Sequence, residues 1–457
     1  MEETGTRAQP IEDRPAEPPH VQASPIIPSE RIISLDVLRG FAILGILIMN
    51  VQSFSMIMAS YINPTAFGDL RGLNRVVWTL SHVFADEKFM SIFSMLFGAG
   101  ILMIAGRAEE KGLSAWSVHG RRSLWLIIFG LLHAYLLWYG DILVAYGVCG
   151  LIVFAFRKAR PLRLLIAGLL IASVASLLYL SFGYSMQYWP PEATENLMRS
   201  WQPDAGHVAR EIAAYQGGWL GQMGIRIPAA VSLQTFVFLI WQGWRVTGLM
   251  LVGMALLKWG VLGAARSRRF YFTWMLTGFL AGYPLILLGV YRNFAAGWAL
   301  EYSMFYGPQL NYWGSILVAF GYVCMVMLLV HAARPGILTR ALAATGRMAF
   351  TNYIMQTLIC TGIFYGHGLG LYARMERKEQ ILVVFSIWVL QLIISPIWLK
   401  HFRFGPLEWL WRSLTYRRRQ PMRIAGDMRS ESKVAGWADT SGDRLRAIEP
   451  GEGHTKV

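Results

Sequence analysis

The sequence has few charged residues, only three cysteines and none of the short motifs of common soluble enzymes. Charged residues make up 15% of the 457 positions, and 27 acidic residues face 42 basic ones. There is no GxxxxGK phosphate loop, no GxSxG elbow and no HExxH zinc motif. Cys149, Cys324 and Cys360 lie in apolar stretches without CxxC spacing. We therefore expect no disulfide framework, no metal site and no tightly bound cofactor.

Apolar residues are abundant instead. Hydrophobic residues form 55% of the chain, including 18 Trp and 24 Phe, which is typical of a polytopic membrane protein rather than of several soluble domains. The net charge of +15 is spread over short clusters between apolar runs and follows no single face. Such clusters predict contact with membrane lipid and no nucleic-acid partner.

Apolar runs of the length that crosses a bilayer as a helix, about 20 residues, recur along the chain. They predict an all-α, polytopic integral membrane bundle of about ten transmembrane helices. The expected spans lie near 36–57, 86–106, 122–139, 141–156, 161–182, 235–257, 270–291, 311–332, 341–365 and 380–400. Around this membrane domain (31–416) we expect a disordered, proline-rich tail over 1–30 and a basic, then mixed-charge flexible tail over 417–457.

Basic residues are distributed unevenly between the loops. The loops after the second, fourth and sixth expected spans carry four Lys or Arg each, and the intervening short loops carry fewer. Short cytoplasmic loops are the ones enriched in Lys and Arg. The pattern thus predicts a multi-pass protein of the inner or plasma membrane with both termini cytoplasmic, and places the RRR run at 417–419 beside anionic lipid. The longest connection, 183–234, then lies outside and could act as a lid.

Polar side chains inside the apolar runs are candidates for function because they are costly at membrane depth unless paired. The stretch SLDVLRGFAILGILIMN (34–50) has Asp36 and Arg39 at one end and Asn50 at the other. Asp36 and Arg39 share a helical face, either as an interfacial cap or as a socket for an anionic group. Asn50 lies roughly 21 Å further along the helix, where it either bonds a neighbouring helix or orients a reacting group.

His133 is the candidate general base. It follows Arg122, at the inner boundary, by 11 residues, which is roughly 16 Å along a helix and close to mid-membrane. Imidazole titrates near neutrality and accepts protons when neutral, although a hydrogen-bonded packing histidine is the alternative. On a regular helix Asp141 would lie about 12 Å away, so contact with His133 is not assumed, and Tyr146 could come nearer.

Two further polar clusters stand at the ends of expected spans. His82, Asp86 and Lys88 mark the outer boundary of the second span, either as a solvated cluster or with Lys88 as a catalytic cation. In the ninth span Asn352 and Gln356 have i, i+4 spacing and share a face. That face either packs helices together or supports a site.

Five blocks of this sequence resemble the YeiB-like family, bacterial membrane proteins carrying the domain of unknown function 418. The blocks are SLDVLRGFAILGILIMN, KFMSIFSMLFGAG (88–100), GLLHAYLLWYGDILVAYGVCGLI (130–152), RMAFTNYIMQTLICTGIFYGHGLG and FRFGPLEWLWRSLTY, with a C-terminal family block over about 235–416. The family is distantly similar to transmembrane acyltransferases of the acyltransferase-3 and heparan glucosaminide acetyltransferase type. Those enzymes also begin with Asp-x-x-Arg-Gly, here Asp36, Arg39 and Gly40, and their first helix ends near an Asn, here Asn50.

The resemblance implies transfer of an acyl group from a cytoplasmic acyl-CoA to a hydroxyl or amine acceptor outside. The inner-face residues Asp36, Arg39 and Arg347 would then meet the donor, and His133 would deprotonate the acceptor. Asn50 or Lys88 would stabilise the oxyanion, with Asp141, Tyr146, Asn352 and Gln356 as supporting polar residues.

The related enzymes carry their catalytic His soon after the first helix, where His82 stands in this sequence. His82 falls outside the YeiB-like blocks and at the membrane boundary, so we expect His133 to act instead. A small-metabolite transporter and a non-catalytic assembly protein are the alternatives to an enzyme. The sequence does not indicate whether the protein is a monomer or an oligomer.

Overall fold

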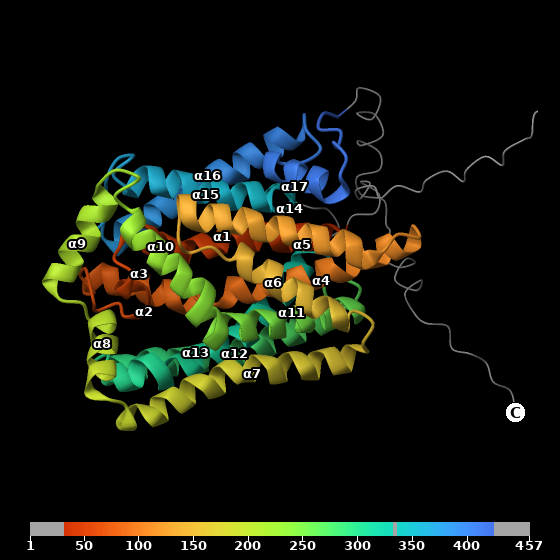
Figure 1. Ribbon diagram of the computed structural model, residues 1–457. Coiled ribbons are helices and arrows are strands. Elements are labelled where there is room, and N and C mark those ends of the chain that lie inside the picture. Colours follow the sequence, from red (N-terminus) through yellow and green to blue (C-terminus); the bar gives the residue numbers. More distant parts are fainter. Residues whose placement is uncertain (1–31, 332–335, 425–457) are drawn as a thin grey trace, which may run out of the picture.

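The computed structural model describes residues 32–331 and 336–424, and this part of the chain is almost entirely helical. Figure 1 shows long helices running side by side in a bundle, with shorter helices across one end. Within the described ranges the only β-type pairing is a bridge between Phe402 and Arg423. The tail expected over 1–30 and most of the tail expected over 417–457 lie outside the described residues.

The first half of the bundle contains the first five expected spans. Its helices are α1 (Ile33–Ser55), α2 (Ala59–Ile62), α3 (Gly72–Phe84), α4 (Lys88–Glu110), α5 (Ala115–Leu132) continued by the π-helical turn η2 (His133–Leu137), α6 (Leu143–Val153) with the 3-10 turn η3 (Phe154–Phe156), and α7 (Pro161–Ser185) with η4 (Met186–Tyr188).

The second half begins with the long connection and continues with the last five expected spans. Its helices are α8 (Pro191–Trp201), α9 (Ala205–Gln216), α10 (Met223–Ser232) with the π-helical η5 (Leu233–Gln242), α11 (Gly243–Lys258), α12 (Arg268–Ala295), η6 (Glu301–Tyr306), α13 (Pro308–Val330), α14 (Ile337–Arg347), α15 (Ala349–Phe364), α16 (Arg377–Leu399) and α17 (Pro406–Tyr416).

Seven helical segments of the described chain are long and apolar enough to cross a membrane, and they coincide with seven of the ten expected spans. The segments are 33–55, 72–110, 161–188, 223–258, 268–295, 301–330 and 377–399. The other three expected spans are helical too, but α6 is short, and the 341–365 span is divided between α14 and α15 at Met348. The chain is therefore an all-α, membrane-embedded helical bundle, as the composition predicted.

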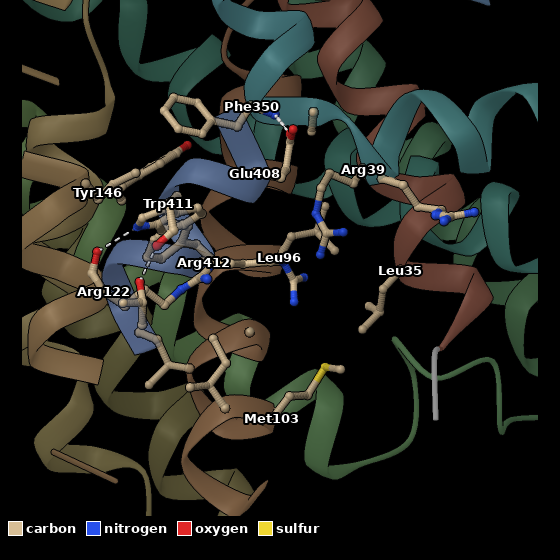
Figure 2. Close-up of a pocket in the computed structure, with 18 of the residues that line it drawn as sticks. Leu35, Arg39, Leu96, Met103, Arg122, Tyr146, Phe350, Glu408, Trp411 and Arg412 are labelled. Carbon is tan, nitrogen blue, oxygen red and sulfur yellow. Dashed lines mark hydrogen bonds between the residues drawn. The ribbon is translucent and has the colours of Figure 1, made fainter. Parts of the chain in front are cut away.

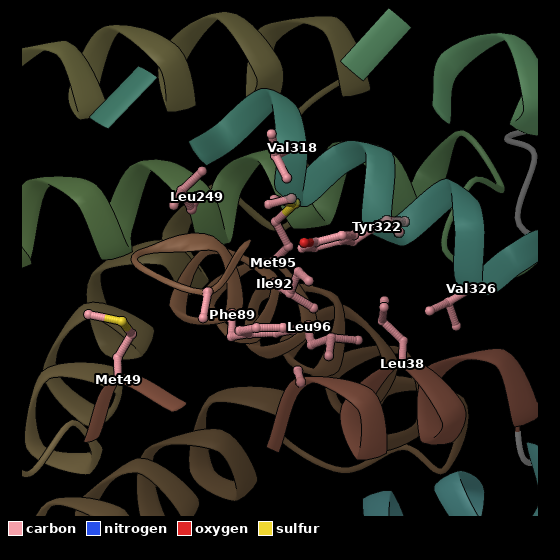
Figure 3. Close-up of a cluster of buried hydrophobic side chains, with 14 of the residues drawn as sticks. Leu38, Met49, Phe89, Ile92, Met95, Leu96, Leu249, Val318, Tyr322 and Val326 are labelled. Carbon is pink, nitrogen blue, oxygen red and sulfur yellow. The ribbon is translucent and has the colours of Figure 1, made fainter. Parts of the chain in front are cut away.

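The centre of the bundle is built from apolar side chains of α1, α4, α11 and α13. Leu38, Ile92, Leu249 and Val318 are each fully buried there, and Figure 3 shows them meeting between these helices. Lipid tails are as apolar as leucine, so close packing rather than removal from water must hold such helices together. Shape complementarity thus decides which helices are neighbours.

Two glycines let α1 and α14 touch through their backbones. A Cβ at Gly40 would overlap the carbonyl oxygen of Leu342, and a Cβ at Gly346 would overlap the carbonyl oxygen of Asp36. The reciprocal contact is the close approach that small residues permit between membrane helices. It brings the Asp36 and Arg39 turn of α1 against the end of α14, where Arg347 lies.

The two ends of the bundle carry different elements. The loop between α4 and α5 and the helix α17 lie at one end, which we call the α17 end, and α8 and α9 lie at the opposite end, the α9 end (Figure 1). At the α9 end, Trp219 and Arg226 from the long connection both donate hydrogen bonds to the carbonyl of Leu136, at 2.7 and 2.9 Å. The 183–234 connection is thus anchored on the end of η2.

Candidate functional site

A cavity of about 260 Å³ opens among α1, α4, α5, α14, α15 and α17 at the α17 end. Figure 2 shows basic and aromatic side chains on its walls. Its cationic lining residues are Arg39, Arg107, Lys111, Arg122, Arg347 and Arg412. Its acidic lining residues are Asp36 and Glu408. The cations therefore outnumber the acids by six to two.

Both acids of the cavity are engaged by protein groups. Arg39 donates to Asp36 across 2.8 Å. The Glu408 carboxylate accepts from the backbone N–H groups of Phe350 and Thr351 at 2.7 and 3.1 Å and from the Thr351 hydroxyl at 2.6 Å. Burial raises the pKa of Glu408 and these hydrogen bonds oppose the rise. Glu408 thus stabilises the N-terminus of α15.

Arg122 is a partly buried cation of the cavity wall. Its guanidinium lies 3.6 Å above the ring of Trp411, and the Trp411 indole N–H donates to the Arg122 carbonyl at 3.0 Å. The charges of Arg412 and Arg39 act on it from nearby. Cations held this close repel one another, so an anionic group among them would be strongly favoured.

Away from the cations, the wall of the cavity is apolar. Ile43 and Ile46 of α1, Ile142 and Leu143 at the start of α6, and Tyr353 of α15 line it. The chamber is thus amphipathic, with a cationic rim at the α17 end and an apolar interior. Such a chamber suits a ligand with a phosphate-rich head and an apolar arm.

Behind this wall lies a buried Asp–His–Thr array. His133 Nδ1 is 2.9 Å from Asp141 Oδ1, and His133 Nε2 is 2.9 Å from Thr357 Oγ1. The side chains of His133 and Asp141 are 1% and 0% exposed. The eight-residue separation did not predict this contact, which forms because the helix ends at Leu137 and the chain then turns back into α6.

Asp141 fixes the imidazole of His133. Its second carboxylate oxygen accepts the backbone N–H of Val144 at 2.9 Å and so holds the first turn of α6. A carboxylate that accepts two hydrogen bonds favours the proton on Nδ1 of His133. Nε2 is then the basic nitrogen, and it faces the Thr357 hydroxyl.

Tyr353 connects the cavity to the array. Its ring centroid lies 5.0 Å from that of His133, and the same side chain lines the cavity. Tyr353 and Thr357 are one turn apart on α15, so one helical face contacts both the cavity and the histidine. The Tyr353 ring therefore lies between His133 and the cavity.

The structure separates three predicted residues from His133. Asn50 is half-buried on α1 and does not line the described cavity. Lys88 is fully buried elsewhere, where it donates to Asn311 Oδ1 and the His82 carbonyl, each at 2.7 Å. Tyr146 lines the cavity wall but donates to the Met90 carbonyl on α4, at 3.2 Å. None of the three has a described contact with the imidazole.

Lys88 belongs to a second cluster of charged residues between α4, α11 and α13. Arg245, also fully buried, lies 3.2 Å from Glu87 and donates to Ser315 at 2.7 Å. Asp86 accepts from Asn311 at 3.1 Å and pairs with His82 at 3.0 Å. Glu87 adopts a left-handed backbone with φ 63°, an uncommon conformation for this residue type. The interpretation of a solvated cluster is therefore wrong for Lys88.

Asn352 and Gln356 lie in the packing of α15 against its neighbours. Asn352 donates to the Thr345 carbonyl and to Ser395 on α16, at 3.0 and 3.1 Å. Gln356 donates to the Ile43 carbonyl on α1 and to Gln391 on α16, at 3.0 and 2.9 Å. These bonds fix the helix that carries Tyr353 and Thr357, so both residues position the site from behind.

Sequence reasoning missed four of the lining cations, Arg107, Lys111, Arg122 and Arg412. It also missed Tyr353, Thr357, Glu408 and Trp411, which stand in two blocks quoted above, RMAFTNYIMQTLICTGIFYGHGLG and FRFGPLEWLWRSLTY. Thr357 follows Gln356 by one position, and a single threonine in an apolar helix does not by itself indicate a functional site. Glu408 in the amphipathic helix α17 was the recognisable one, because an acid followed by Trp409 and Trp411 is unusual in a basic segment.

Comparison with known proteins gives the family. The model described as "Protein of unknown function (DUF418)" matches residues 256–418. The Escherichia coli (strain K12) protein described as "Uncharacterized protein YeiB" is 33% identical over 401 residues, covering 86% of this chain and 98% of its own. The chain belongs to the YeiB-like DUF418 family. The resemblance carried by the five blocks is confirmed.

Two further relatives have the same extent. The Bacillus subtilis (strain 168) protein described as "Uncharacterized protein YxaH" is 32% identical over 418 residues, covering 87% of this chain and 97% of its own. A Bacillus acidopullulyticus relative, described as an "Uncharacterized 39.9 kDa protein in amylase 3'region", is 28% identical over 398 residues. These relatives thus match most of this chain over almost their whole length.

Proposed function

We propose that this DUF418 protein is a membrane acyltransferase that takes an acyl group from a cytoplasmic acyl-CoA and passes it to a hydroxyl or amine acceptor from the outer side. The observation that carries the proposal is the position of Tyr353, which lines the cationic cavity and packs against His133. One side chain thus contacts both the cationic cavity and the buried histidine.

The donor would bind with its phosphates among Arg39, Arg347 and the other cations of the rim. Charge-assisted bonds from arginine to phosphate are the strong ones, and the guanidinium can bind two oxygens at once. The pantetheine arm and the acyl group would extend along the apolar wall toward Tyr353. This assignment follows the expectation that the α17 end is cytoplasmic.

The chemistry would take place at Nε2 of His133. The acceptor O–H or N–H gives its proton to Nε2 as its heteroatom attacks the thioester carbonyl, and the C–S bond then breaks as the intermediate collapses. The imidazolium, stabilised by Asp141, returns the proton to the departing CoA thiolate. Thr357 is a positioning residue that holds Nε2 until the acceptor replaces it.

The acceptor would arrive from the α9 end. Trp219 and Arg226 tie the long connection to the carbonyl of Leu136, three residues after His133. The Trp138 ring lies 6.1 Å from the imidazole and stacks on Phe54 at 4.1 Å between ring centroids. Movement of this connection would open the outer side of His133, in keeping with a lid.

The test compares variants of His133 and His82 in inverted membrane vesicles. The vesicles are supplied with octanoyl-CoA that is radiolabelled in the octanoyl group, and the measurement is the label transferred to an acceptor. His133→Ala should lower transfer by about 10²–10⁴-fold, as is typical for loss of a general base. His82→Ala should cost less than about tenfold, because His82 has no described contact with the cavity or the array. An equal or larger loss at His82 would move the chemistry to the second charged cluster.

A small-molecule transporter is the second candidate, and the buried charges around Arg245 favour it. Intramembrane charges often form proton or substrate pathways. This bundle contains a cluster of buried charged residues that includes Glu87, Lys88 and Arg245. Purified protein that binds no octanoyl-CoA would remove the main support for acyl transfer and put the transporter first.

A further inference from the structure

A second basic feature of this protein lies on the side of α17 that faces away from the cavity. A shallow groove runs between α5 and α17 and is lined by Arg121, Leu124, Trp125, Trp409, Ser413, Leu414, Arg417, Arg418 and Arg419. Four of these nine residues are arginines, and none of the described lining residues is acidic. The groove shares no lining residue with the cavity.

The two faces of α17 explain the separation. Glu408, Trp411 and Thr415 recur at helical spacing and line the cavity. Trp409 and Ser413, one turn apart on α17, line the groove together with Arg417, which directly follows the helix. Helix α17 thus separates the cationic cavity from the basic groove at the surface.

The backbone that carries the three consecutive arginines is held in a defined fold. The N–H groups of Arg417 and Arg418 donate to the carbonyls of Leu414 and Ser413, at 3.3 and 3.1 Å. The Trp409 indole donates to the Gln420 carbonyl at 2.7 Å, and the Gln420 N–H donates to Ser413 at 3.2 Å. Residues 417–420, at the start of the expected flexible tail, are therefore folded back onto α17.

Arg121 brings a fourth cation to the groove from α5. It donates to the Thr415 carbonyl at 2.9 Å and to the Ser117 hydroxyl at 2.6 Å. Partial burial and the nearby positive charge of Arg417 lower the pKa of Arg121 below its ordinary value. The groove therefore gathers positive charge, which an anion would relieve.

The apolar residues of the groove indicate what kind of anion fits. Leu124 is 55% exposed, and it lies at the start of the third expected span. The groove also contains two tryptophans, and Arg419 lies 6.0 Å from the ring of Trp409. Tryptophans and arginines together are characteristic of the membrane interface, where the headgroups meet the acyl chains.

We infer that this groove binds the headgroup of an anionic glycerophospholipid from the adjoining leaflet. The phosphate would lie among Arg121 and Arg417–Arg419, and the acyl chains would run down past Leu124 and Trp125. A soluble anion would use the arginines only, whereas a lipid also covers the exposed leucine and the tryptophans. The inference does not depend on acyl transfer, because no groove residue belongs to the cavity or to the array.

The test uses full-length protein purified in detergent and titrated with phosphatidylglycerol or phosphatidylcholine. Native mass spectrometry measures the fraction of protein that carries lipid. The wild type should bind phosphatidylglycerol in preference to phosphatidylcholine. The triple variant Arg417→Gln, Arg418→Gln, Arg419→Gln should weaken phosphatidylglycerol binding by roughly fivefold for each arginine removed.

The matched control removes three charges from another loop of the same expected side, in Lys158→Gln, Arg160→Gln, Arg163→Gln. These side chains are exposed and line neither the cavity nor the groove. The control should keep the lipid preference, and Leu124→Ser should weaken lipid binding without changing charge. Equal losses in both triple variants would overturn the inference, since only net charge would then matter. Displacement by millimolar inorganic phosphate with no effect of Leu124→Ser would also overturn it, in favour of a site for soluble anions.

Discussion

The carboxylate of Asp141 lies 2.9 Å from Nδ1 of His133, although the two residues would stand far apart on a continuous helix. The helix that carries His133 ends four residues later, and Asp141 begins the next one by binding the N–H of Val144. One carboxylate thus stabilises the start of a helix and orients His133, the candidate base that contacts Tyr353 of the cavity wall.

This pairing predicts a large effect of Asp141→Asn on catalysis. The amide oxygen can still accept from Val144, so the fold should hold, but the amide no longer fixes the proton on Nδ1 or stabilises an imidazolium. We expect the turnover of octanoyl-CoA to fall by about 10²–10⁴-fold, with little change in KM. The measurement is a pH profile of turnover with a thermal unfolding curve of the same preparation. If Asp141→Asn does not fold, Asp141→Glu replaces it in the test and should keep part of the activity, because it retains a carboxylate. Wild-type turnover in a folded Asp141→Asn protein would contradict the role of Asp141.

Arg39 should contribute to donor binding. Arg39→Ala removes one cation of the rim and should weaken octanoyl-CoA binding by about 10–100-fold, the loss expected for one charge-assisted partner of a phosphate. Asp36→Asn should strengthen binding or leave it unchanged, because it removes the acid that competes for Arg39. Calorimetry on purified protein measures both. The matched control is Arg163→Ala, an exposed arginine outside the cavity, and a similar loss there would show that net charge and not the cavity binds the donor.

The contact between α1 and α14 should be sensitive to a single methyl group. In Gly346→Ala the new Cβ would overlap the carbonyl oxygen of Asp36, so the helices must separate at a cost of about 1–3 kcal/mol. We expect a lower thermal unfolding midpoint together with weaker octanoyl-CoA binding, because Arg347 moves with α14. The control is Gly106→Ala on α4, whose new Cβ meets no described atom within 4 Å. An unchanged midpoint in Gly346→Ala would refute the close contact.

The charge of the loops predicts which end of the bundle faces the cytoplasm. The three native cysteines are buried, so an introduced cysteine can be labelled against a low background. Ala205→Cys, exposed at the start of α9, should react with a membrane-impermeant maleimide in intact cells. Lys158→Cys should react only in inverted vesicles, and a reporter fused after residue 420 should read as cytoplasmic. The reverse pattern would place the cationic cavity on the outer side and exclude a cytoplasmic acyl-CoA donor.

The sequence by itself determined the class of this protein and most of its helices. A chain so rich in apolar residues must satisfy its backbone hydrogen bonds locally when it enters lipid, and helices do so without regard to their neighbours. Local composition therefore predicted the spans, and the cost of polar groups in lipid marked Asp36, Arg39 and His133 as candidates for function.

Only the tertiary structure decided which of these residues meet. His133 pairs with Asp141 because a helix ends between them, and it reaches Thr357 across 224 positions of sequence. Lys88 and Arg245 are buried by contacts among α4, α11 and α13 and do not line the cavity, and no local pattern encodes those contacts. In a membrane helix the lipid-facing and protein-facing sides are almost equally apolar, so the sequence shows that a polar residue is present but not which helix it faces.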